Sequence, residues 1–268
     1  MPYAGVDAGS RMIKIVLVAD DGMQVIAKGC TDQGIDQDRI ATSLFATILS
    51  QAGLRRSQVR RVVATGYGRA RISLADTTIT EITCQAVAIH RLLPEARTVI
   101  DIGGQDSKII RLADSGRVFD FVMNDRCAAG TGRFLEVVAD RLGVDLVDLG
   151  PLAATSREPA VISSMCVVFA ETEIIGLLAA NRPREDIVAG VQRAIAQRIH
   201  GMAGRTMRGP VVFTGGVALV AGMQSALEDA LGLQVVIPQE PHMTAAFGAA
   251  ILARDIQQGG HYFLGGQP

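Results

Sequence analysis

Two stretches of the chain carry the same polar residues at the same spacing. Residues 6–15 and 100–109 each contain an Asp, then a Gly, then a Lys, and the two sets lie 94 residues apart. An aspartate beside a glycine turn can hold magnesium directly or through its waters, and the backbone amides of such a turn can approach phosphate closely. The pattern predicts a phosphate and magnesium site built twice. The matching residues are Asp7 and Asp101, Gly9 and Gly103, and Lys14 and Lys108.

Lysine usage supports this interpretation. The chain has only three lysines among 26 basic residues, and two of the three, Lys14 and Lys108, occupy the same position of the repeat. A lysine ammonium is a compact point charge, which suits phosphate neutralisation. One copy alone would read as an ordinary hairpin, but two copies in register favour nucleotide binding. The Walker and Rossmann patterns are missing, which indicates a different nucleotide fold.

A third glycine element fits the same kind of site. Residues 211–218 form an apolar run that enters Gly215 and Gly216, and a helical pattern follows from about residue 220 to 231. A strand, a glycine turn and a helix N-terminus together can seat an adenosine or a phosphate. Alone this signal is weak, because glycine is common at strand-to-helix turns.

The elements around the repeat predict a duplicated α/β unit. Each copy opens a three-stranded meander, helical patterns follow near 38–52 and 81–92, and an apolar stripe at helical spacing runs through 187–202. We expect a first half at 1–95 and a second half at 96–242, with a cleft between them. A last helix near 243–256 is expected to pack back on the first half, and 257–268 to form a loose tail.

Composition excludes several classes of protein. The 268 residues carry a net charge of -1, and aromatics are 4% with no Trp, which argues against a nucleic-acid binder. No apolar run is long enough to cross a bilayer, and the N-terminus does not resemble a signal peptide. We therefore expect a cytoplasmic protein that acts without membrane or nucleic acid, with reduced cysteines unless they bind metal.

Two of the four cysteines precede predicted helices. Thr131 is a possible N-cap shortly after Cys127, and Ser163 or Ser164 is a possible cap beside Cys166. A helix N-terminus favours the thiolate and therefore metal ligation. Two cysteines cannot complete a four-thiolate site, but a symmetric dimer can. Taken from the residues alone, a small buried hydrophobe is the commoner role for a cysteine.

Three segments, 64–69, 100–106 and 124–134, resemble those of the ATPase activator (archerase) family of 2-hydroxyacyl-CoA dehydratases, which is related to the ATPase subunits of benzoyl-CoA reductase. The resemblance extends from residue 5 to about 253. It implies the duplicated actin and sugar-kinase fold, with two halves around a nucleotide cleft. The segment around Cys127 is its most specific part.

The resemblance also implies cofactors. In that family a homodimer holds one [4Fe-4S] cluster through two cysteines of each subunit, and the matching residues are Cys127 and Cys166. ATP or ADP would bind with Mg²⁺, Asp7 and Asp101 being the catalytic candidates. The candidate nucleotide-binding residues are Gly9, Ser10, Arg11, Lys14, Gly103, Gly104, Gln105, Lys108, Gly215 and Gly216. Cys30 and Cys84 match no ligand position.

The implied function is ATP-dependent electron transfer. The protein would accept an electron from a ferredoxin or flavodoxin and pass it to a partner dehydratase or reductase component. ATP binding would rotate the two halves and change the angle between the cluster-bearing helices. The alternatives are a sugar-type kinase of the same superfamily, a benzoyl-CoA reductase-type ATPase subunit, and a nucleotide-dependent scaffold with negligible turnover.

Overall fold

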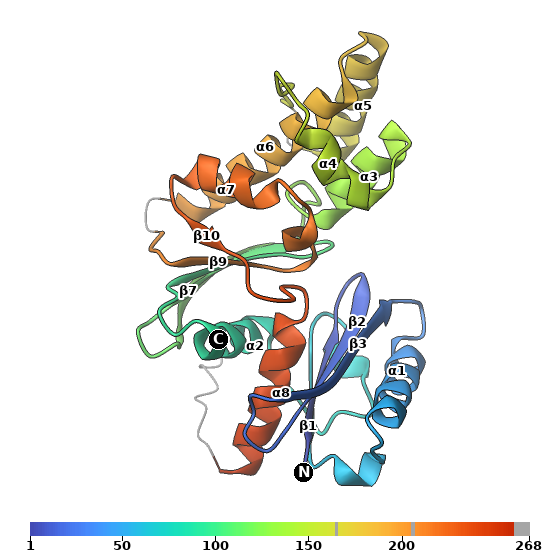
Figure 1. The fold of residues 1–268 in the computed structure, drawn as a ribbon, viewed down its shortest axis with the longest axis vertical. Coiled ribbons are helices and arrows are strands. Elements are labelled where there is room, and N and C mark those ends of the chain that lie inside the picture. Colours follow the sequence, from blue (N-terminus) through green and yellow to red (C-terminus); the bar gives the residue numbers. More distant parts are fainter. Residues whose placement is uncertain (164–165, 205–206, 260–268) are drawn as a thin grey trace. The chain divides into compact units, whose positions relative to one another are not determined.

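The computed structural model describes residues 1–163, 166–204 and 207–259 and divides the chain into two compact units. Unit 1 comprises residues 1–94 and the chain from 243 onward, and unit 2 comprises 95–242. Each unit is built on a five-stranded sheet flanked by helices (Figure 1). Of the expected tail, residues 260–268 lie outside the described part of the chain.

The sheet of unit 1 has the order β3-β2-β1-β4-β5. Strand β1 pairs antiparallel with β2 and parallel with β4, which makes the sheet mixed. The strands are β1 (Tyr3–Ala8), β2 (Met12–Val18), β3 (Val25–Asp32), β4 (Val62–Thr65) and β5 (Thr77–Thr78).

Helices cover both faces of this sheet because its central strands are apolar on both faces. Helix α1 (Gln37–Gln51) packs on one face, and α2 (Glu81–Leu92) and α8 (Thr244–Gln257) pack on the other (Figure 1). Along β1, Val6 faces α1 and Tyr3 faces α8, as the two-residue period of a strand requires. Short 3₁₀ turns at Arg56–Gln58 and Arg69–Arg71 connect the remaining elements.

Helix α8 lies against its neighbours at backbone distance. A Cβ at Gly248 would lie 1.9 Å from the carbonyl oxygen of Cys84 on α2. A Cβ at Gly5 on β1 would lie 2.0 Å from the carbonyl oxygen of Ala246. Both positions therefore exclude a side chain. The two glycines allow α8 to pack directly against the backbones of α2 and β1.

The sheet of unit 2 repeats the topology of unit 1. Its order is β10-β9-β6-β7-β8, with β6 antiparallel to β7 and parallel to β9. Written in the opposite direction, β8-β7-β6-β9-β10, this order corresponds strand for strand to that of the first sheet. The duplication predicted from the repeat is therefore confirmed. The strands are β6 (Thr98–Ile102), β7 (Ser107–Leu112), β8 (Val118–Asn124), β9 (Val211–Thr214) and β10 (Val235–Val236).

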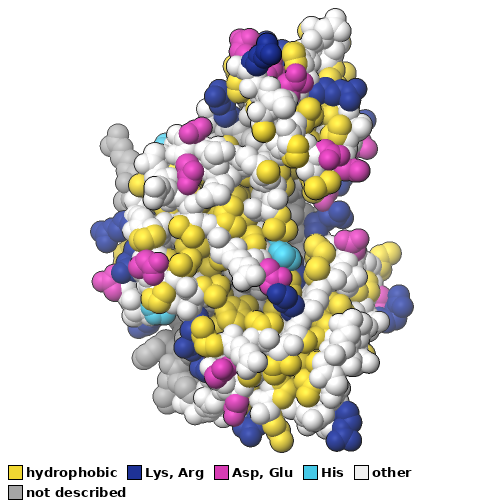
Figure 2. Space-filling model, viewed as in Figure 1, with side chains coloured by type: hydrophobic (Ala, Val, Ile, Leu, Met, Phe, Trp, Pro, Cys, Tyr) yellow, Lys and Arg dark blue, Asp and Glu magenta, His cyan; other side chains and the backbone are white. Residues whose placement is uncertain are grey.

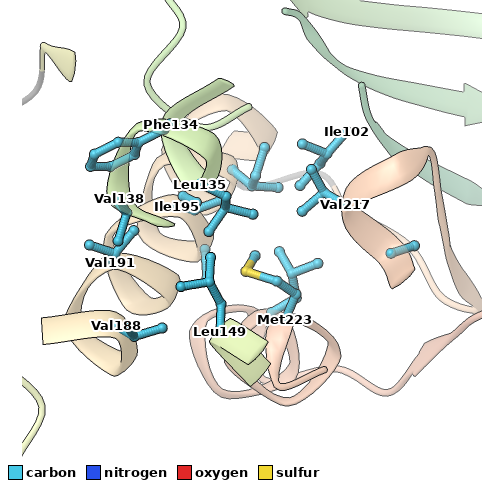
Figure 3. Packing of buried hydrophobic residues seen from close by; sticks show 14 of the residues in the cluster. Ile102, Phe134, Leu135, Val138, Leu149, Val188, Val191, Ile195, Val217 and Met223 are labelled. Carbon is cyan, nitrogen blue, oxygen red and sulfur yellow. The ribbon is translucent and has the colours of Figure 1, made fainter. Parts of the chain in front are cut away.

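The helices of unit 2 share one hydrophobic core with its sheet. Figure 3 shows Val138 beside Val191 and Leu135 beside Ile195, so the packed faces come from helices far apart in sequence. The helices are α3 (Gly132–Leu142), α4 (Leu149–Ala153), α5 (Val167–Ala179), α6 (Arg184–Ala203) and α7 (Met223–Leu231). 3₁₀ turns lie at Leu146–Asp148 and Gly216–Leu219.

One helix begins later than the sequence indicates. The pattern predicted a helix from about residue 220, but α7 begins at Met223 because Gly222 adopts a left-handed φ of 87° at its N-cap. The glycine pair therefore leads into the 3₁₀ turn Gly216–Leu219 and not directly into an α-helix.

Figure 2 shows charged side chains of both signs scattered over the visible face without a large Lys and Arg patch. Within residues 1–163, 166–204 and 207–259, none of the helices has the length and apolar character needed to cross a bilayer.

The contact between α8 and α2 gives a stability prediction. Gly248→Val places three carbons where the Cys84 carbonyl already lies, so we expect the free energy of unfolding to fall by about 3 kcal/mol or more. Gly201→Val is the matched control, because a Cβ there meets nothing within 4 Å. Urea unfolding of both variants measures the difference, and an equal loss in the two would contradict the packing argument.

Candidate functional site

The first hairpin brings Asp7 and Lys14 together. The two residues are direct cross-strand partners on β1 and β2, so their side chains leave the same face of the sheet. Lys14 Nζ donates to Asp7 Oδ2 at 2.8 Å. Asp7 Oδ1 is buried and has no hydrogen-bond partner among the described residues. In the Asp7 carboxylate, Oδ2 therefore accepts a hydrogen bond from Lys14, whereas Oδ1 accepts none from the described residues.

The second hairpin brings Asp101 and Lys108 together in the same way. Lys108 Nζ lies 3.4 Å from Asp101 Oδ2 and 2.8 Å from Asp106 Oδ2. The hydroxyl of Thr214 donates to Asp101 Oδ1 at 3.1 Å. Both oxygens of Asp101 are thus engaged, in contrast to Asp7.

A Thr-Gly pair stands at the end of the fourth strand of each unit, and the sequence pattern predicted Gly215 as a site residue but not its counterpart Gly66. Gly66 and Gly215 have left-handed φ values of 86° and 88°. A Cβ at Gly66 would lie 2.4 Å from Asp7 Oδ1, and one at Gly215 would lie 2.8 Å from Asp101 Oδ1. The backbone of each glycine therefore lies directly beside the aspartate carboxylate of its own unit, where a side chain would not fit. The signal was present as Val-Val-x-Thr-Gly at 62–66 and again at 211–215.

The remaining phosphate-loop candidates lie in the two hairpin turns. The first turn is closed by a bond from Gly9 N to the Met12 carbonyl at 3.1 Å, and the second by a bond from Gly103 N to the Asp106 carbonyl at 2.9 Å. The turns hold Ser10 and Arg11 in unit 1 and Gly104 and Gln105 in unit 2. Arg11 and Gln105 are exposed at the turns, and a Cβ at Gly216 would meet nothing within 4 Å.

The second turn is hydrogen-bonded to helix α3. The amide of Gly132 donates to the Gly103 carbonyl at 2.9 Å, and the amide of Arg133 donates to the Gly104 carbonyl at 2.8 Å. A Cβ at Gly132 would lie 3.2 Å from the Gly103 oxygen, so glycine permits this approach. The first amides of α3, which a helix cannot satisfy internally, are thereby satisfied by the hairpin turn.

Cys127 lies in the loop that leads into this helix. Its side chain is half-buried, and its carbonyl accepts a 2.7 Å bond from the Asn124 side chain at the end of β8. Thr131 is the N-cap residue of α3, as predicted, but its hydroxyl donates to the Ala128 carbonyl at 2.6 Å and does not accept from the helix. The loop is therefore fixed at both of its ends.

Cys166 is itself the N-cap residue of α5, and its side chain is half-buried. The prediction that Ser163 caps this helix is wrong, because its amide and hydroxyl both donate to the Glu173 carboxylate at 2.9 Å. These two hydrogen bonds fix the preceding loop to α5 through Glu173. The other candidate cap, Ser164, lies outside the described residues.

The other two cysteines differ in burial. Cys30 is exposed on β3, whereas Cys84 is fully buried on α2. Burial raises the pKa of the Cys84 thiol to about 12. A thiol with this pKa stays protonated at neutral pH, so Cys84 is a core residue.

Metal-ligating side chains are not gathered within one chain. Among the residues that the structure describes, His, Cys, Asp and Glu form no group of three or more that could hold a metal ion. Any four-thiolate group would need thiols from more than one copy of the chain.

Comparison with known proteins identifies the family. The model of the BadF/BadG/BcrA/BcrD ATPase family matches residues 4–253. The (R)-2-hydroxyglutaryl-CoA dehydratase activating ATPase of Acidaminococcus fermentans is 39% identical over 251 residues, which cover 93% of this chain and 95% of that protein.

Two solved structures extend the comparison to the fold. The activator of 2-hydroxyisocaproyl-CoA dehydratase from Clostridium difficile with bound ADPNP is 37% identical, covers both chains fully and has a TM-score of 0.91. A ROK hexokinase of Thermus thermophilus, 16% identical over 97% of this chain and 100% of its own, has a TM-score of 0.55 and shares the fold. The chain thus has the duplicated α/β fold of actin and the sugar kinases and belongs to the BadF/BadG/BcrA/BcrD ATPase family.

Proposed function

We propose that this ATPase is an electron-transfer activator. It accepts a low-potential electron from a ferredoxin or flavodoxin and delivers it to a partner iron–sulfur enzyme, such as a 2-hydroxyacyl-CoA dehydratase, or to a reductase component. We further propose that it works as a cytoplasmic homodimer. The observation that carries this proposal is a pair of backbone hydrogen bonds. The amides of Gly132 and Arg133, at the start of α3 shortly after Cys127, donate to the carbonyls of Gly103 and Gly104.

The proposed nucleotide-binding residues lie in the hairpin turn of each unit. The turns at 9–11 and 103–105 cradle phosphate, and Lys14 and Lys108 offset part of its charge. Gly215 and Gly216 are proposed to contact the adenosine. A bound Mg²⁺ supplies further charge neutralisation at the phosphates.

We propose different roles for Asp7 and Asp101. The buried and unpartnered Oδ1 of Asp7 fits a ligand that brings hydrogen-bond donors, such as the attacking water or a water of Mg²⁺. Asp101 already accepts from Thr214 and Lys108, so we assign it to orienting Lys108 and the second turn. Asp7 is accordingly the stronger candidate for the catalytic residue.

A [4Fe-4S] cluster fits the thiols of Cys127 and Cys166 by donor chemistry. Both thiols are half-buried, which keeps them within reach of solvent and of a second copy. Four thiolates are required, and a homodimer supplies two from each chain. The cluster would supply the one-electron chemistry when it is bound.

The exposed face of α5 supports the homodimer. Val168 and Phe169, directly after Cys166, are 68% and 67% exposed, and Ile175 is 49% exposed. Large apolar side chains clustered on one surface helix are typical of an interaction surface. We propose that a second copy covers this face and places its own cysteines beside those of the first.

In this proposal the nucleotide acts through α3. When phosphate binds at Gly103 and Gly104, any movement of their carbonyls is passed to the amides of Gly132 and Arg133. Side chains on the inner face of α3 are packed into the core of unit 2, so we expect the helix to shift as a unit and not to bend. The loop of Cys127 precedes the helix directly, so the thiolate follows the state of the nucleotide.

The cysteine assignment is tested by Cys127→Ser. After anaerobic reconstitution, the wild-type protein should contain about four irons per dimer and absorb broadly near ~400 nm. The variant should lose the iron and the electron delivery while its ATP affinity stays within about threefold. Cys30→Ser, at an exposed strand position, is the control and should keep both. A colourless wild-type protein that still hydrolyses ATP would overturn the proposal and favour the kinase alternative.

The coupling step is tested by Gly132→Ala. The added Cβ would lie 3.2 Å from the Gly103 oxygen, so the two hydrogen bonds should lengthen and lose about 1–2 kcal/mol in total. In the wild-type protein, ADPNP should change the rate at which Cys127 is alkylated, and in the variant this dependence should shrink about threefold or more. Gly201→Ala, on an open position, serves as the control. The same nucleotide dependence in all three proteins would exclude the α3 route.

The division between the aspartates is tested by two amide substitutions. Asp7→Asn should lower kcat for ATP by about 10²-fold or more, because a carboxylate positioned at the reacting water or metal is lost. Asp101→Asn should act mainly on stability, lowering the free energy of unfolding by about 1–3 kcal/mol as Lys108 loses one carboxylate. Steady-state ATPase assays and urea unfolding measure both effects. Equal kcat losses in the two variants would contradict the division.

A further inference from the structure

Arg198 on α6 packs against the loop that carries Cys127. A Cβ at Gly130 would lie 2.9 Å from Arg198 Cδ, 3.5 Å from Nε and 3.6 Å from Cγ. Gly130 also has a left-handed φ of 88°. The aliphatic stem of Arg198 therefore lies directly on this backbone, three residues beyond Cys127. The dihedral angle favours glycine there, and a Cβ would displace the Arg198 stem.

The charge of Arg198 has no counterpart among the described residues. Its Nε is buried and donates to no acceptor, and no ion pair or hydrogen bond engages its guanidinium in residues 1–163, 166–204 and 207–259. Other half-buried arginines of unit 2 do have carboxylate partners, for example Arg111 with Asp120 and Arg182 with Asp186. The Nε atoms of Arg111 and Arg182 are also buried without a hydrogen-bond partner, but both of those guanidiniums are ion-paired, so it is the lack of an ion pair at Arg198 that indicates a missing anion.

We infer that Arg198 is a positioning residue whose charge stabilises the anionic iron–thiolate group bound through Cys127. This inference rests on the proposed function. A guanidinium is always charged and presents planar donors, which suits an anion that approaches from the side of the loop. The neighbouring stem of Arg198 also holds the loop at Gly130, so one side chain contributes both the position and the charge.

The role has a defined electrostatic consequence. When one electron from a reductant enters the iron–thiolate group, no bond breaks and one negative charge is added. A fixed positive charge nearby stabilises the reduced form more than the oxidised form and therefore raises the reduction potential. Removing the charge should favour the oxidised form, whereas a purely structural role of Arg198 predicts no change in potential.

The test compares three substitutions in the reconstituted full-length protein. Arg198→Met keeps an unbranched apolar stem and removes the charge, and Arg198→Lys restores the charge. Arg193→Met removes an exposed arginine from the same helix as the control. Each protein is titrated anaerobically with dithionite while its visible absorption is recorded. Far-UV circular dichroism confirms that each variant is folded, and ADP affinity is measured separately.

We expect the reduction equilibrium of Arg198→Met to shift about tenfold toward the oxidised form, which is 59 mV for one electron. Arg198→Lys should recover most of the shift, and Arg193→Met should match the wild-type protein. An unchanged potential in Arg198→Met overturns the inference, and a fall in its ADP affinity at that unchanged potential would assign the charge to phosphate. A wild-type protein that takes up no iron overturns the proposed function, and the role of Arg198 falls with it.

Discussion

Two backbone hydrogen bonds join the second hairpin turn to the helix after Cys127, and the rest of the site depends on them. They run from the amides of Gly132 and Arg133 to the carbonyls of Gly103 and Gly104. Each bond satisfies a helix amide that would otherwise lack a partner, so the contact is favourable whether or not a ligand is bound. Glycine at 132 favours this approach, because a Cβ there would lie 3.2 Å from the Gly103 carbonyl oxygen.

Both sides of this joint are held by further contacts. The turn is closed on itself by the hydrogen bond from the Gly103 amide to the Asp106 carbonyl, and the inner face of α3 is buried in the core of unit 2. A close-packed core resists small displacements. The same core includes α6, which carries Arg198 against the Cys127 loop at Gly130. Two packed helices therefore contact this loop.

The two units show how a duplicated fold can divide its roles. The strand order is the same in both, and each has an aspartate opposite a lysine and a Thr-Gly pair after its fourth strand. The hydrogen bonds differ. In unit 2 the lysine is 3% exposed between two carboxylates and the aspartate is fully bonded, whereas in unit 1 the lysine is 16% exposed and one aspartate oxygen is left over. Identical topology therefore places the two carboxylates in different hydrogen-bond environments.

The sequence by itself determined the duplication, the two Asp and Lys pairs and the helices after Cys127, because strand and helix periodicity and glycine turns are local properties. It did not reveal Gly66 as the counterpart of Gly215, the second carboxylate on Lys108 or the place of Arg198. These depend on which segments meet in space, and residues 113 or 68 positions apart, such as Asp101 and Thr214 or Gly130 and Arg198, carry no periodic signal of their contact. Only the tertiary structure decided them, since packing and hydrogen-bond partners are settled when distant elements close on one core.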